Sequence, residues 1–240
     1  MPAVPPPIDL LIACALRPEA SAIAGRMAGA GRKSIGGFAG HRGLFAGRQT
    51  LLVRAGPGAA AARRGVACAL GLAKPRLLID FGAAGAVNPS LAPGDCLVSR
   101  TAIPYKPPAA DRGASASPAG AFEPALHRGV ALPGSLCDQL SRAPGVRLGA
   151  FGSADYSVAG VEARAAIREQ YGLDAVDWET FAVLSLAEEQ ELPAFAFRVI
   201  TDLAGPHAGK EFHALHRQLL AQAAERLARI VECLDWTALR

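Results

Sequence analysis

The chain has 240 residues, of which 51% are hydrophobic and 19% are charged, and its formal net charge is +4. This length and hydrophobic content suffice for one large core, so we expect a single domain over 1–240 with a flexible N-terminus at 1–7. The basic residues form no block and are not interleaved with aromatic residues, which argues against a nucleic-acid partner. The apolar run at 8–16 is too short for a membrane span and follows no positive charge, so neither an anchor nor a signal peptide is expected.

Short apolar runs alternate with helical patterns along the chain. The near-continuous hydrophobicity of these runs predicts strands that are buried on both faces. In chain order, we expect strands at 8–15, 51–54, 76–81, 95–98, 146–151, 174–177 and 194–200. The helical spacing of apolar residues predicts helices at 59–72, 163–171, 179–190 and 210–234, the last of them long and amphipathic. This alternation is typical of an α/β fold.

Two stretches interrupt the alternation. Residues 82–86 form a Gly- and Ala-rich turn after a predicted strand, where small side chains would let a ligand approach the backbone. This turn matches neither GxGxxG nor a P-loop, which argues against a dinucleotide or ATP site. Residues 104–124 are rich in Pro, Ala, Gly and Ser, and they predict a long mobile loop between two halves of the domain.

The five cysteines lie far apart in the sequence. They are Cys14, Cys68, Cys96, Cys137 and Cys233, and they form no CxxC pair and no cluster with His at zinc spacing. We therefore expect no metal site, and no organic cofactor is needed for the chemistry considered below. An odd number of cysteines with mostly apolar neighbours predicts a reducing, cytoplasmic location.

Acidic residues stand at the ends of two late apolar segments. Asp202 ends the run at 194–202, and burial at a strand end would raise its carboxyl pKa and make it a proton donor. Asp177 and Glu179 follow the earlier apolar segment at 174–176. Two acidic strand ends in one domain indicate a site, although Asp202 alone would also fit a turn cap.

Four parts of the chain together resemble the nucleoside phosphorylase/nucleosidase superfamily, most closely its 5′-methylthioadenosine/S-adenosylhomocysteine nucleosidases. They are Ala-Leu-Arg-Pro-Glu-Ala at 15–20, Ala-Gly-Pro-Gly at 55–58, Asp-Phe-Gly-Ala-Ala-Gly at 80–85 with Gly-Asp at 94–95, and Val-Asp-Trp-Glu at 176–179 with Arg-Val-Ile-Thr-Asp at 198–202. The resemblance implies a mixed sheet curled into a barrel and flanked by helices. It also implies a purine nucleoside substrate with a 5′ substituent, and a homodimer or larger homo-oligomer.

The resemblance implies roles for four residues. Asp202 matches the acid that protonates the departing purine, and Thr201 matches the residue that orients it. Glu19 matches the residue that activates the attacking water, and Glu179 matches the carboxylate that binds the ribose hydroxyls. The structural alternative for Glu19 and Glu179 is a favourable interaction with the dipole of a helix that begins beside them.

Further substrate contacts are implied by position. Trp178 replaces a Met that packs under the sugar, and Tyr156 stands one place before the expected base-stacking aromatic, where the chain has Ser157. Other residues implied to bind the substrate are Asp177, Gly82, Ala83 and Val158. Arg198 interrupts an apolar strand and needs a partner when buried, which we expect to be Glu19 or Glu179, making Arg198 an orienting residue.

The departures from the phosphorylase pattern favour water over phosphate as the nucleophile. Asp80 and Ala83 stand where phosphorylases carry Arg and Ser, and Glu19 stands where they present another Arg. A different anion site stays open as an alternative, and the residues that could form it are Arg17, Arg54 and Arg63.

Two alternatives to a nucleosidase stay open. One is a phosphorolytic enzyme, including the hopanoid-associated type, which shares Phe-Gly-x-Ala-Gly and Val-Asp-x-Glu and would need a wide apolar 5′ pocket rimmed by 104–124, Leu132 and Leu136. The other is a nucleoside-binding protein with weakened catalysis. This alternative is suggested by Ala83, Trp178 and the position of Tyr156, which depart from the family pattern.

Overall fold

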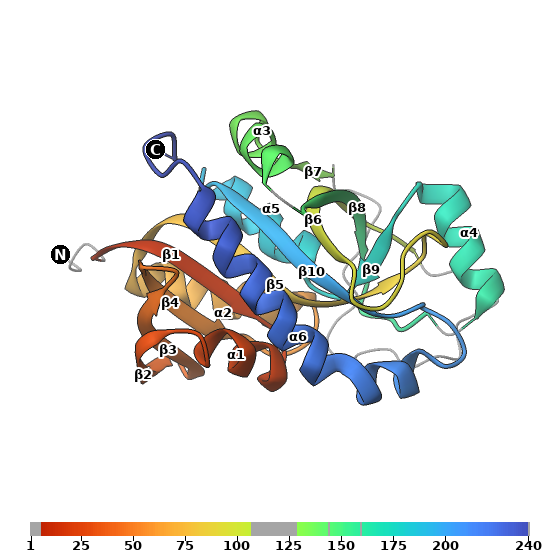
Figure 1. Cartoon of the computed structure of the whole chain (residues 1–240), viewed down its shortest axis with the longest axis horizontal. Helices are drawn as coiled ribbons and strands as arrows, with labels where there is room; N and C mark the ends of the chain where they lie inside the picture. The colour runs from red at the N-terminus through yellow and green to blue at the C-terminus, as the bar shows by residue number, and fades with distance from the viewer. Residues whose placement is uncertain (1–5, 107–128, 144, 159, 240) are drawn as a thin grey trace.

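The computed structural model describes residues 6–106, 129–143, 145–158 and 160–239 (Figure 1). The strands are β1 (Pro7–Cys14), β2 (Ala28–Ile35), β3 (Phe38–Phe45), β4 (Arg48–Arg54), β5 (Lys74–Ala86), β6 (Cys96–Pro104), β7 (Val130–Ala131), β8 (Arg147–Ser153), β9 (Ala175–Asp177) and β10 (Ala194–Asp202). The helices in these ranges are α1 (Arg17–Ala24), α2 (Ala59–Leu72), α3 (Gly134–Arg142), α4 (Val161–Tyr171), α5 (Thr180–Glu189) and α6 (Ala208–Cys233). None of these helices is long and apolar enough to cross a membrane.

One part of the sheet closes into a barrel. The strand order is β10-β6-β8-β9-β5-β1-β4-β3-β2, with β7 beside β6, and β10 also pairs with β5. This extra pairing closes β10, β6, β8, β9 and β5 into a five-stranded barrel, which β1, β4, β3 and β2 extend as an open sheet. Parallel pairs such as β1–β5 and β5–β10 combine with antiparallel pairs such as β6–β10. The expected mixed sheet, curled into a barrel and flanked by helices, is confirmed.

Strand β1 explains why the strands appear as continuous apolar runs. Its residues Leu10 and Ile12 belong to a core that includes apolar residues of α1 and α6. Leu11 and Ala13 belong to a second core, formed with residues of α2 and α5. Figure 1 shows α6 crossing one face of β10 and β5, with α2 on the other side of the sheet. Both faces of the strand are therefore buried, as the hydrophobic pattern predicts.

The predicted elements are largely confirmed, but the strands expected at 76–81 and 95–98 are too short, because β5 continues to Ala86 and β6 to Pro104. The helix expected at 59–72 is α2, and the long helix expected at 210–234 is α6. The turn predicted at 82–86 is instead the second half of β5, because these residues pair with β10 and β9. A run of small residues has no alternating pattern, so only its pairing partners reveal it as a strand.

The antiparallel hairpin formed by β2 and β3 was not predicted, nor were α1, α3 and β7. Seven of the eight residues of β2 are exposed, so this edge strand has no buried face and therefore no hydrophobic period. Of the expected flexible segments 1–7 and 104–124, residues 1–5 and 107–124 lie outside the described residues. Within the described part, Pro7 already begins β1, and Tyr105 is buried after the end of β6.

Candidate active site

Four adjacent parallel strands, β10, β5, β1 and β4, end at the same edge of the sheet. Asp202 ends β10, and the Gly- and Ala-rich stretch 82–86 ends β5. Residues 15–19 follow β1, and residues 55–58 follow β4. In α/β proteins, ligands bind at the carboxyl ends of such strands. The fold thus brings together the segments that carry the predicted site residues.

Glu19, in the first turn of α1, links the loop after β1 to β5. Its Oε2 atom accepts hydrogen bonds from the backbone N–H groups of Ala15 (2.9 Å) and Leu16 (2.7 Å), and its Oε1 atom accepts one from Ala83 (3.0 Å). The residue is only 3% exposed. Burial raises the pKa of this carboxyl group, although Arg198 and the three hydrogen bonds oppose that rise.

Gly82 leaves room for the ends of the Glu19 and Arg198 side chains. A Cβ atom at this position would lie 2.1 Å from Nη1 of Arg198 and 2.6 Å from Oε1 of Glu19. No side chain larger than hydrogen fits there without moving both groups. The small residue predicted to admit a ligand therefore admits two side chains of the site itself.

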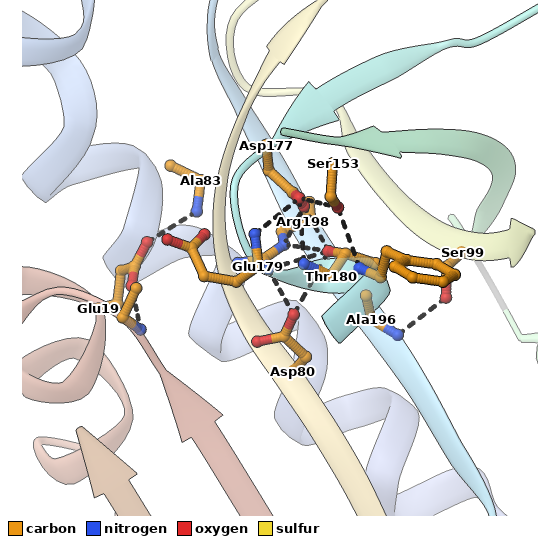
Figure 2. Close-up of polar contacts among 12 residues, drawn as sticks. Glu19, Asp80, Ala83, Ser99, Ser153, Asp177, Glu179, Thr180, Ala196 and Arg198 are labelled. Atoms are coloured by element: carbon orange, nitrogen blue, oxygen red, sulfur yellow. Dashed lines mark hydrogen bonds and ion pairs between the residues drawn. The ribbon is translucent and has the colours of Figure 1, made fainter. Parts of the chain in front are cut away.

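Glu179 precedes α5, yet its side chain does not cap that helix. Its Oε1 atom instead accepts a hydrogen bond from the backbone N–H of Gly58, at the start of α2 (2.8 Å). Burial raises the pKa of Glu179 to about 8, and the negative charges of Asp177 and Glu19 act in the same direction. In Figure 2 the carboxyl groups of Glu179 and Glu19 lie on the same side of Arg198.

Asp202 is held at the end of β10 by two hydrogen bonds. Its Oδ2 atom accepts one from the Thr201 hydroxyl (3.0 Å), and its Oδ1 atom accepts one from the Ala204 N–H (2.9 Å). The second contact is the turn cap considered as an alternative role. Burial raises the pKa of Asp202, and the charge of Glu211 on α6 adds to the rise.

The end of β5 relates these acids in space. Glu19 contacts Ala83, and a Cβ at Gly85 would lie 2.8 Å from Oδ1 of Asp202. Positions 83 and 85 of an extended strand are roughly 7 Å apart. Glu19 and Asp202 therefore both lie beside the last residues of β5.

The ion-pair partners of Arg198 differ from the prediction. The guanidinium pairs with Asp80 and with Asp177 (Nε to Oδ2, 3.0 Å), and not with Glu19 or Glu179 (Figure 2). Its charge, which is fully buried, therefore has two buried carboxylates as partners. Burial raises the pKa of Asp80 to about 7, against the opposing effect of the guanidinium.

Asp177 was predicted to bind the substrate, but its carboxylate is already occupied. In addition to the ion pair, Oδ1 accepts hydrogen bonds from the Ser153 hydroxyl (2.6 Å) and from the backbone N–H groups of Glu179 and Thr180 (3.1 Å each). These contacts use the lone pairs that a substrate would need. The arrangement makes Asp177 a positioning residue for Arg198 and for the start of α5.

The remaining predicted residues cluster around 156–158. Trp178 donates its Nε1 hydrogen to the backbone oxygen of Tyr156 (2.8 Å), so the two segments that resemble the family are in contact. Tyr156 and Val158 are buried, whereas Ser157 is exposed. The aromatic residue therefore lies inside and the serine at the expected position does not.

Sequence reasoning did not identify Asp80 and Thr180 as the centre of a polar network. Asp80 interrupts the apolar strand β5 just as Arg198 interrupts β10, and that coincidence was the available signal. It also missed Asp155, whose Oδ1 atom accepts a hydrogen bond from Ala59 in the first turn of α2 (2.9 Å). Across the described ranges, no group of three or more His, Cys, Asp or Glu side chains is placed to hold a metal ion.

Comparisons with known proteins agree with this fold. A nucleosidase for 5′-methylthioadenosine and S-adenosylhomocysteine from Bacillus cereus is 23% identical over 221 residues, which cover 91% of this chain and 96% of that protein. The Streptococcus pneumoniae nucleosidase of the same name, solved with a transition-state inhibitor, has a TM-score of 0.80 and 22% identity, covering 95% of this chain and all of that one. A futalosine hydrolase mutant of Helicobacter pylori has a TM-score of 0.79 and 19% identity, covering 94% and 99%. The family model described as the phosphorylase superfamily matches residues 9–234, and the chain belongs to that superfamily.

Proposed function

We propose that the protein is an enzyme that hydrolyses the N-glycosidic bond of a purine nucleoside carrying a 5′ substituent. The observation that carries this proposal is the convergence of Glu19, Glu179 and Asp202 at the end of β5, each with burial raising its pKa. Perturbed carboxyl groups that share one strand edge are typical of a catalytic site. The names of the relatives point to methylthioadenosine and S-adenosylhomocysteine as substrates.

The three acids have complementary roles in this reaction. Breaking the bond between C1′ and the purine places positive charge on the ribose and negative charge on the base. Asp202, whose raised pKa favours the protonated form, gives its proton to a purine nitrogen. Glu179 accepts hydrogen bonds from the ribose hydroxyls, and the positive charge that develops on the sugar favours its ionised form, which in turn stabilises that charge. Glu19 takes a proton from the water whose oxygen bonds to C1′.

The contacts of Glu19 favour water over phosphate as the nucleophile. Its carboxylate already occupies the three backbone N–H groups, from Ala15, Leu16 and Ala83, that would otherwise bind an anion at this edge. Arg198 is committed to two buried carboxylates, so it has no unpaired charge to offer a phosphate. Asp80 disfavours phosphate because it forms an ion pair with Arg198, and not because its own charge faces the nucleophile.

The cellular location and the oligomeric state of the enzyme belong to the same proposal. All five cysteines are unpaired, which suits a reducing cytoplasm. A homo-oligomer follows from the family resemblance, and size-exclusion chromatography with light scattering tests it.

The direct test is adenine release from methylthioadenosine, measured in phosphate-free buffer and again with added phosphate. Release without phosphate is the expected result. Release only in the presence of phosphate would replace hydrolysis by phosphorolysis. Tight binding of the nucleoside without release would instead identify a binding protein with the fold of an enzyme.

A further inference from the structure

A cavity of about 380 Å³ lies beside the site, at the ends of β1 and β4. Its walls are residues 15–17 after β1, residues 37–39 between β2 and β3, and residues 54–57 at the end of β4. Arg17 and Arg54 are the charged residues among these, and no acidic residue lines the cavity. The cavity is therefore an electropositive hollow at the edge of the sheet.

The two arginines lack partners in the described part of the chain. Neither Arg17 nor Arg54 forms an ion pair or a side-chain hydrogen bond there, whereas Arg63, the third candidate for an anion site, pairs with Glu189. Arg17 is exposed and Arg54 is partly buried. Two unpaired guanidinium groups around one hollow attract an anion, and a guanidinium matches the geometry of a carboxylate or phosphate.

The cavity shares its walls with the proposed catalytic site. Ala15 and Leu16 line it, and their N–H groups hold the Glu19 carboxylate. Pro57 also lines it and directly precedes Gly58, whose N–H holds Glu179. The cavity is thus next to the groups that we assign to the ribose and the water.

The strand order gives the direction in which a substrate extends. Asp202 lies on β10, Glu19 reaches β5 from the loop after β1, and Arg54 ends β4, so base, sugar and cavity follow the row β10-β5-β1-β4. Three steps between neighbouring strands span roughly 14 Å. In a β-nucleoside the base on C1′ and the 5′ carbon on C4′ project from the same face of the ribose, at the two carbons that flank the ring oxygen, so the base and the 5′ substituent extend away from each other along the ring. A nucleoside with its base at Asp202 therefore directs its 5′ substituent toward the cavity.

We propose that Arg17 and Arg54 bind an anionic group, a carboxylate or a phosphate, at the end of the 5′ substituent. This inference rests on the proposed function and makes nucleosides with an acidic 5′ end its preferred substrates over neutral ones. A neutral 5′ end, such as a methylthio group, would leave both guanidinium groups without a ligand.

The test compares substrates that differ only in this charge. S-adenosylhomocysteine carries a carboxylate, and 5′-deoxy-5′-(3-aminopropylthio)adenosine is the same molecule without it. We expect kcat/KM for the first to exceed that for the second by about tenfold or more, the usual contribution of a charge-assisted hydrogen bond. Arg17→Gln and Arg54→Gln should each reduce this ratio, whereas Arg63→Gln, at a surface pair, should leave it as in the wild type. Adenosine 5′-monophosphate provides the phosphate arm and identifies which anion is preferred.

Several results would overturn the inference, and they differ from those that reject the proposed function. Equal kcat/KM values for the matched pair together with slow cleavage of the monophosphate, or ratios that neither arginine substitution changes, would exclude an anion site for the 5′ end. Release that needs inorganic phosphate, with a KM for phosphate that rises in both arginine variants, would assign the cavity to the nucleophile. Failure to release adenine from any of these nucleosides would reject the hydrolase itself.

Discussion

The guanidinium of Arg198 and the carboxylate of Asp80 form an ion pair in the protein interior, although 118 residues separate them in the sequence. Their side chains are 1% and 3% exposed. Asp177, at the end of β9, is the second carboxylate that pairs with this guanidinium. This pairing places a permanent positive charge behind Glu19 and Glu179 without exposing it to an incoming anion.

Arg198→Met is expected to destabilise the protein, because it leaves Asp80 and Asp177 buried without their counter-charge. Removing one partner of a buried ion pair typically costs about 3–5 kcal/mol. Urea unfolding measures this change in the free energy of unfolding. Adding Asp80→Asn to the same variant should restore part of the loss, since one uncompensated carboxylate is then gone. A loss below about 1 kcal/mol in the single variant would contradict the pairing.

Gly82→Ala is expected to reduce activity and stability together. Its added methyl group would overlap Nη1 of Arg198 and Oε1 of Glu19, so both side chains must move. Gly71→Ala is the matched control, because a Cβ at that position in α2 meets nothing within 4 Å. The control should raise the free energy of unfolding by about 0.5–1 kcal/mol, as expected for Gly→Ala in a helix. Equal effects of the two substitutions would argue against the close contact.

Asp202→Asn should abolish most turnover while leaving the fold intact. The amide keeps the shape of the side chain and its acceptor for Ala204, but it has no acidic proton to give to the purine. Loss of general acid catalysis lowers kcat by about 10²–10⁴. Circular dichroism and melting temperature verify the fold, and Asp138→Asn, at an exposed position on α3, is the control. Near-normal turnover would remove Asp202 from the mechanism.

Glu19→Ala should lower kcat by about 10²–10³ and should respond to small carboxylates. The truncation removes the proposed base and frees the N–H groups of Ala15, Leu16 and Ala83. Formate matches the lost carboxylate in charge and size, so we expect it to restore part of the rate in a concentration-dependent manner. The same formate series with Asp202→Asn should give no recovery. A fully active Glu19→Ala variant would disprove the assignment of the base.

Stability should fall as the pH rises, with Glu179 as one cause. Burial raises the pKa of Glu179 from 4.5 to about 8, so the folded protein binds this proton more tightly than the unfolded chain. The resulting stabilisation is complete below about pH 4.5 and is lost as the pH rises through about 8. Between pH 5 and 9, the wild type should lose at least about 1 kcal/mol more than Glu179→Gln in urea unfolding. Parallel pH profiles for the two proteins would contradict a buried proton at this position.

Local pattern sufficed for much of this fold and for the positions of the acids. The run at 194–202 is mostly apolar and ends in an Asp, and the buried residues of the helix at 59–72 lie at helical spacing. Both properties depend on neighbours along the chain. The strand ends that carry Asp177 and Asp202 could therefore be located, and the resemblance to the superfamily implied that Glu19, Glu179 and Asp202 share a site.

The tertiary structure alone decided which of these groups touch. Residues 82–86 form a strand only because β10 and β9 supply hydrogen-bond partners, and β2 has no buried face to mark it. Arg198 could be recognised as a charge that needs a partner, but its choice of Asp80 and Asp177 over Glu19 and Glu179 depends on the register between strands far apart in sequence. Local sequence determines which segments can be strands and where their acids stand, whereas contact between side chains depends on how those strands pair.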